Sequence, residues 1–95
     1  MKIERTSTGK IELRLSDDPD QFKRLAEVVR KKLGGRWTEQ LDEFDQSYWD
    51  LEVGGKKITM HREHFLGVSV FCDDDVALRS LLEELQREFE PVPHK

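Results

Sequence analysis

The chain has little of several features that would narrow its function. Its single cysteine, Cys72, excludes an internal disulfide, and no apolar run approaches the roughly 20 residues of a membrane-spanning helix. The first ten residues lack the apolar stretch of a secretory signal. These absences favour a cytoplasmic protein without a membrane partner. We expect one domain over residues 1–95, with a frayed tail over residues 91–95.

The sequence also lacks the motifs of common enzyme chemistry. It contains no phosphate-binding loop, dinucleotide-binding fingerprint or nucleophile elbow. The aspartate pair Asp17–Asp18 and the triplet Asp73–Asp75 fit helix caps. A carboxylate exposed to water in a cap has no reason to have the raised pKa that a general acid needs. Cys72 fits a small buried hydrophobe at a strand end. We therefore expect a protein that is not an enzyme and binds no cofactor.

Positive charge is scarce in the second part of the chain. Residues 1–36 contain ten Lys and Arg against six Asp and Glu, whereas residues 37–90 contain five against fourteen. An acidic majority argues against nucleic acid and favours a basic protein as partner. The alternative is a solvated surface with no partner, because net charge bears on solubility before it bears on partners. The sequence leaves open whether the chain forms a homo-oligomer.

Two amphipathic helices are predicted. Asp18 and Pro19 suit the cap and first position of the first helix, which Gly34–Gly35 ends. Asp73–Asp75 open the second helix, and Pro91 and Pro93 stop it. Each helix has one apolar stripe with the same spacing: Phe22, Leu25, Ala26, Val29 and Leu33 in the first, and Leu78, Leu81, Leu82, Leu85 and Phe89 in the second.

Alternating and β-branched residues predict strands over residues 2–5, 11–15, 37–41, 48–53, 56–63 and 66–72. Two helices with a single apolar stripe each can cover one side of a sheet. The predicted fold is therefore α+β: a two-layer sandwich in which a mostly antiparallel sheet has both helices packed on one face.

The Gly54–Gly55 pair predicts a two-residue hairpin turn, because both central residues of a type I′ turn need positive φ. Counting outward from this turn places Leu51 opposite Ile58 and Trp49 opposite Met60, on what must be the core side. Tyr48 then lies opposite His61 on the other side.

His61 and His64, in the stretch ITMHREH, are candidates for a metal site or an acid–base pair. On a strand, residues three apart point to opposite faces, so the two side chains should diverge, and we expect no metal site. A bulge or turn near Phe65–Gly67 would bring them together. A small enzyme or metal-binding protein that uses both histidines is therefore the alternative.

The side of the sheet away from the helices is the candidate binding surface. We call it the open face; it comprises Tyr48, Asp50, Lys57, His61, Glu63 and Phe71. Aromatic rings supply contact area and charges set orientation, so we expect a non-catalytic protein-binding module. Histidine titrates near pH 6.5, which predicts a pH-dependent contribution from His61 there. The alternative is an ordinary solvated sheet face.

The run YWDLEVGGKKITMHREHFLGVSVF, about a quarter of the chain, resembles the central hairpin of small uncharacterised bacterial proteins. In these a Tyr-Trp-Asp strand, a Gly turn, a His-Glu-His strand and a Leu-Gly strand follow in order. The resemblance implies a two-layer α/β sandwich and assigns no reaction or catalytic residue. Size, acidity and fold class are also similar to those of bacterial immunity proteins, which implies a second alternative, an inhibitor that covers the active site of a basic toxin.

Overall fold

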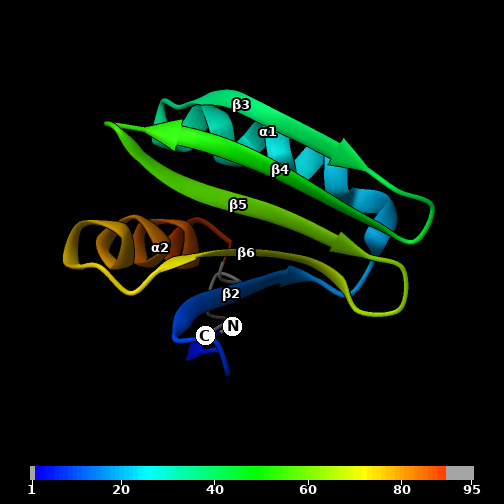
Figure 1. Ribbon diagram of the computed structural model, residues 1–95, viewed down its shortest axis with the longest axis horizontal. Coiled ribbons are helices and arrows are strands. Elements are labelled where there is room, and N and C mark those ends of the chain that lie inside the picture. Colours follow the sequence, from blue (N-terminus) through cyan, green and yellow to red (C-terminus); the bar gives the residue numbers. More distant parts are fainter. Residues whose placement is uncertain (1, 90–95) are drawn as a thin grey trace, which may run out of the picture.

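Six antiparallel strands and two helices make up the fold (Figure 1), which the computed structural model describes over residues 2–89. The strand order in the sheet is β1-β2-β6-β5-β4-β3. This confirms the α+β class and the antiparallel sheet. The expected helix stop at Pro91 and Pro93 and the frayed tail lie outside the described residues. The elements in chain order are β1 (Ile3–Arg5), β2 (Lys10–Ser16), η1 (Pro19–Gln21), α1 (Phe22–Leu33), β3 (Arg36–Asp42), β4 (Gln46–Val53), β5 (Lys56–Glu63), β6 (Gly67–Asp73) and α2 (Val76–Phe89).

The helix starts differ from the predicted ones by a few residues. Asp18 does act as a cap, accepting a hydrogen bond from the Asp20 backbone N–H at 2.9 Å, but the turn it caps is the 3-10 helix η1. Only the last aspartate of the triplet caps α2: Asp75 accepts from the backbone N–H groups of Ala77 and Leu78 at 2.9 and 3.1 Å. The prediction that α2 opens at Asp73 is wrong, because that residue still pairs with Lys10 in the sheet.

The predicted register of the β4–β5 hairpin is confirmed at every position, including Leu51 with Ile58, Trp49 with Met60 and Tyr48 with His61. Both turn glycines have positive φ, 56° at Gly54 and 80° at Gly55. The strand predicted to begin at Leu66 begins at Gly67 instead. Leu66 lies in the preceding turn and is 51% exposed, so the alternation that buries Val68 and Val70 does not extend to it.

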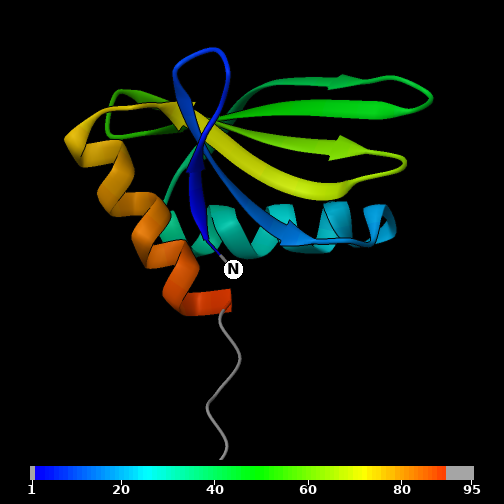
Figure 2. The ribbon, with the colours of Figure 1, turned by 90° about the horizontal axis from the view of Figure 1, so that it is seen from below.

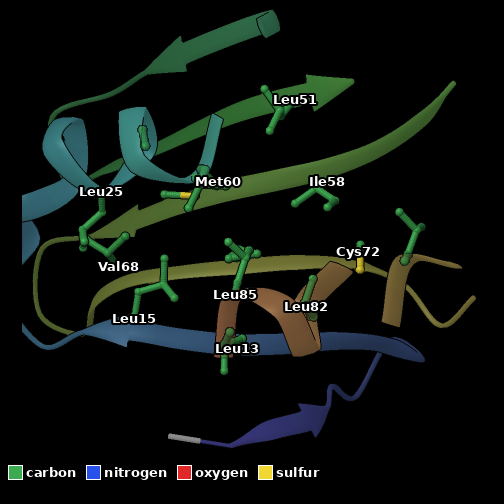
Figure 3. Close-up of a cluster of buried hydrophobic side chains, with 14 of the residues drawn as sticks. Leu13, Leu15, Leu25, Leu51, Ile58, Met60, Val68, Cys72, Leu82 and Leu85 are labelled. Carbon is green, nitrogen blue, oxygen red and sulfur yellow. The ribbon is translucent and has the colours of Figure 1, made fainter. Parts of the chain in front are cut away.

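The core is a single cluster of buried side chains that joins the two helices to the sheet. Buried residues of α1 and α2, including Leu25, Leu82 and Leu85, form one cluster with alternate residues of β2, β4, β5 and β6 (Figure 3). Figure 2 shows α1 and α2 below the strands. Trp49 faces this cluster but is only partly buried. Neither helix in the described part of the chain is long and apolar enough to cross a bilayer.

The turn between β1 and β2 rises on the side of the sheet opposite the helices (Figure 2). β2 pairs with β6 in antiparallel register, so that Glu12 lies beside Phe71 and Arg14 beside Ser69. Thr6 accepts hydrogen bonds at its hydroxyl from the backbone N–H groups of Thr8 and Lys10, which hold the turn in shape. The N-terminal hairpin therefore borders the open face.

Candidate functional site

Three aromatic side chains meet on the open face. The His61 ring stacks on Tyr48, with ring centroids 4.4 Å apart and an angle of 11° between the planes. Phe71 approaches the same imidazole edge-on, with a centroid separation of 6.1 Å. β4, β5 and β6 supply one ring each, and all three side chains are partly buried. The pairing of these strands therefore assembles an ordered aromatic cluster on the side that faces away from the core.

His61 is poorly solvated at the centre of this cluster. Its Nε2 atom is buried and has no hydrogen-bond partner among the described residues. Burial lowers the pKa of the imidazole, and Arg62 acts in the same direction, whereas Glu63 and Glu12 oppose the shift. His61 is therefore uncharged at neutral pH. The expectation that its contribution changes near pH 6.5 needs correction, since protonation in the folded protein falls at lower pH.

The charged residues of the open face differ in how they are paired. Asp50 accepts a hydrogen bond from the Thr59 hydroxyl at 2.7 Å and lies 4.0 Å from the Lys57 ammonium. Glu63 and Glu12 form no ion pair with another described residue. Both of these carboxylates lie close to His61 and line one small hollow beside it.

A hollow of about 250 Å³ adjoins the aromatic cluster. We call it the aromatic hollow; its lining residues are Thr6, Thr8, Lys10, Glu12, Tyr48, His61 and Phe71. The four residues from the N-terminal hairpin were not predicted to belong to the site. The alternation of Lys10 and Glu12 with Ile11 and Leu13 indicates that they point away from the core, but only the pairing of β2 with β6 brings them beside Phe71.

The two histidines of ITMHREH do not converge. His61 lies within β5, whereas His64 follows the end of that strand and is exposed in the turn. The His64 ring contacts Phe65 at a centroid distance of 4.8 Å, and its backbone N–H donates to the Asp45 carbonyl at 2.9 Å. Among residues 2–89, no three His, Cys, Asp or Glu side chains gather as a metal-binding group would.

Cys72 is buried at the end of β6, as its sequence context predicts. Burial raises the pKa of its thiol to about 11, and the neighbouring Asp73 acts in the same direction. Because the thiolate is the nucleophilic form, the raised pKa disfavours a nucleophilic role for this side chain at neutral pH.

A larger hollow, of about 430 Å³, lies on the other side of the sheet next to the start of α1. Three of the polar side chains that line it, those of Asp42, Ser47 and Arg62, already form hydrogen bonds. Arg62 donates to the Ser47 hydroxyl at 3.1 Å and to the Glu43 carbonyl at 2.9 Å, and Asp42 accepts from the Trp49 indole at 2.9 Å. We favour the aromatic hollow as the candidate site despite its smaller volume, because it places three aromatic rings beside a carboxylate that forms no ion pair within the described residues.

Two further aromatic side chains were also missed by the sequence interpretation. Phe44, in the β3–β4 turn, is 98% exposed, and Phe65, in the β5–β6 turn, is 85% exposed. Both turns lie at the same end of the sheet (Figure 1). Each is a phenylalanine in a turn between two strands, and hydrophobic periodicity gives no signal for such an isolated position.

The position of His61 predicts how stability depends on pH. Its folded-state pKa is below the unfolded value, so the unfolded chain binds more protons between the two values. The contribution of His61 to stability is therefore complete at pH values above its unfolded pKa of about 6.5. It is lost as the pH falls below that value toward the pKa of His61 in the folded protein. Urea denaturation between pH 7.5 and 5 should therefore show a smaller loss of stability for His61→Gln than for the parent protein. The exposed His64 is the control, and an equal effect of His64→Gln would contradict the assignment.

Comparison with known proteins gives no relative from which a function could be transferred. No family model, curated protein or solved structure matches the chain. The similarity of its central hairpin to small bacterial proteins, and of its general character to immunity proteins, thus stays a hypothesis, and the functional argument rests on the geometry of the open face.

Proposed function

We propose that this protein is a non-catalytic binding module that recognises another protein through its open face. The observation that carries the proposal is the stacked cluster of Tyr48, His61 and Phe71 on the side of the sheet away from the core. Ordinary solvated sheet faces carry scattered aromatic residues, whereas on this face Tyr48 and Phe71 both contact the ring of His61. Aromatic residues are enriched among the side chains that contribute most to protein binding.

The rings are held in place without a partner, which lowers the entropy lost on binding. Tyr48 stacks on His61, and its hydroxyl donates to the Gln46 side-chain oxygen at 3.0 Å. A tyrosine also combines a large apolar surface with a polar group at its tip, which suits a surface exposed to water before binding. A protein partner could therefore cover these rings with little rearrangement of the sheet.

The charges favour a basic partner. The cations beside the aromatic cluster contact acids of the same chain, as in the 2.6 Å ion pair between Lys10 and Asp73, while Glu12 and Glu63 have no cationic partner in the described chain. Complementary charge would speed association and make it dependent on salt. The same acids disfavour a nucleic-acid backbone. A cytoplasmic inhibitor of a basic toxin is one form this function could take.

Truncating Tyr48 tests the proposal. After capture of a partner from a lysate of the source cells, Tyr48→Ala should weaken binding by at least about 2 kcal/mol, the scale of an interface hot spot. Titration calorimetry with purified proteins gives the affinity, and circular dichroism checks that the variant is folded. Tyr48→Phe, which keeps the ring and loses only the bond to Gln46, should bind nearly as well as the parent. Affinity of Tyr48→Ala equal to that of the parent would refute the open face as the binding surface.

A further inference from the structure

The aromatic hollow has the dimensions of a site for one side chain. Its volume of about 250 Å³ lies below the range of pockets that enclose whole small-molecule ligands, about 300–1,000 Å³. Rings from three strands of the sheet line one part of it, and the N-terminal hairpin lines the rest. A long side chain from a bound protein could enter it while the rest of the interface covers the surrounding sheet.

Aromatic rings and one carboxylate give the hollow its binding chemistry. The rings of Tyr48, His61 and Phe71 offer contact to an aliphatic stem and electrostatic attraction to a cation. Glu12, which lines the same hollow, is partly buried and forms no ion pair within residues 2–89. A partly buried carboxylate without a cationic partner is a favourable place for an incoming positive charge.

The basic groups around the hollow do not oppose such a guest. The Lys10 ammonium lies 2.6 Å from the Asp73 carboxylate, so its charge is already balanced. The guanidinium of Arg14, two residues after Glu12 on β2, donates to the Leu66 carbonyl and lies 3.8 Å from the Asp17 carboxylate. His61 is uncharged at neutral pH for the reason given above. The carboxylate of Glu12 thus decides the sign of the local charge.

We propose that the aromatic hollow binds an arginine side chain of the protein partner, with the guanidinium against Glu12 and the stem against the aromatic rings. This inference rests on the proposed function and specifies which residue of the partner anchors it. Arginine is favoured over lysine because its planar guanidinium pairs with a carboxylate through two parallel hydrogen bonds and also stacks on aromatic rings. The hydroxyl of Thr8, 3.0 Å from that of Thr6, is a further potential acceptor, whereas the Thr6 oxygen already accepts two backbone hydrogen bonds.

The test uses a small probe and needs no identified partner. N-acetyl-L-arginine methylamide is titrated into the ¹⁵N- and ¹³C-labelled protein at pH 7.5, and chemical shifts are followed by NMR. We expect saturable shifts centred on Tyr48, His61 and Phe71, with a dissociation constant in the millimolar range, about 4 kcal/mol of binding free energy. The citrulline analogue of the probe, which has the same shape without the charge, should bind at least about fivefold more weakly.

Two matched variants locate the charge that matters. Glu12→Gln should weaken the arginine probe by about fivefold or more, because it removes the carboxylate that lines the hollow. Glu63→Gln removes an equal charge that also acts on His61 but does not line the hollow, so it should have a smaller effect. Thermal melts followed by circular dichroism confirm that both variants are folded.

Three results would overturn the inference: no saturable shifts at the aromatic cluster, equal binding of the citrulline probe, or equal effects of the two glutamate substitutions. They are distinct from failure of the proposed function. If the probe does not bind while Tyr48→Ala still weakens the captured partner, the open face is the interface and arginine is not its anchor. If the probe binds as expected while Tyr48→Ala leaves partner affinity unchanged, the proposed function fails and the hollow stands as a guanidinium site.

Discussion

Replacing Gly67 with alanine is expected to lower the free energy of unfolding by about 3–4 kcal/mol. Gly67 opens β6 with φ of 103°, a conformation that L-residues rarely adopt. A Cβ atom there would also clash with the Ser16 carbonyl oxygen and would lie 2.8 Å from the Asp17 Cα. These atoms belong to the main chain where β2 ends, so relieving the clash requires moving one strand away from the other.

Gly9→Ala is the matched control for this prediction. Gly9, in the β1–β2 turn, has a similar φ of 82°, but nothing lies within 4 Å of a Cβ atom built on it. The strain of positive φ is therefore present without the clash, and the expected loss is about 1–2 kcal/mol. Urea denaturation of the parent and both variants measures the difference. Equal losses would show that the contact between Gly67 and the end of β2 adds nothing beyond backbone strain.

Truncating Trp49 to alanine should cost about 3 kcal/mol, at the lower end of the range for a large aromatic residue because the indole is only partly buried. The ring contacts Phe22 of α1 edge-on at a centroid distance of 4.9 Å, and Trp37 of β3 at 5.4 Å. Its indole N–H donates to the Asp42 carboxylate at 2.9 Å. Trp49, on β4, thus links helix α1 to β3 and β4 at one edge of the sheet.

Trp49→Phe separates packing from hydrogen bonding. Phenylalanine keeps an aromatic ring against Phe22 but leaves Asp42 without the indole donor, so we expect a loss of only about 1 kcal/mol. The Asp42 carboxylate keeps its hydrogen bond from Ser47, the largest of the effects that hold its pKa below the ordinary value. An unchanged denaturation midpoint for Trp49→Ala would mean that the contacts of Trp49 with α1 and β3 do not stabilise the fold.

The parts of the site that could be predicted from the sequence are those built within one hairpin. The turn at Gly54–Gly55 sets which residues of β4 and β5 are opposite one another, and alternation then assigns Tyr48 and His61 to the same face. The same two-residue period predicted that His61 and His64 diverge; they do, although His64 lies in the turn beyond β5 and not on the strand. Nothing beyond seventeen consecutive residues, 48–64, was needed for these inferences.

The sequence by itself thus determined the fold class, the β4–β5 register and the outward direction of the aromatic residues, because turns and alternation act between near neighbours in the chain. Only the tertiary structure decided that Glu12 lies beside Phe71, two residues separated by most of the chain, and that Thr6 and Thr8 border the same hollow. It also decided the environment of His61, whose pKa depends on how completely other strands exclude water from the ring. Pairing between distant strands and the desolvation it causes depend on the packing of the whole chain, which no local pattern encodes.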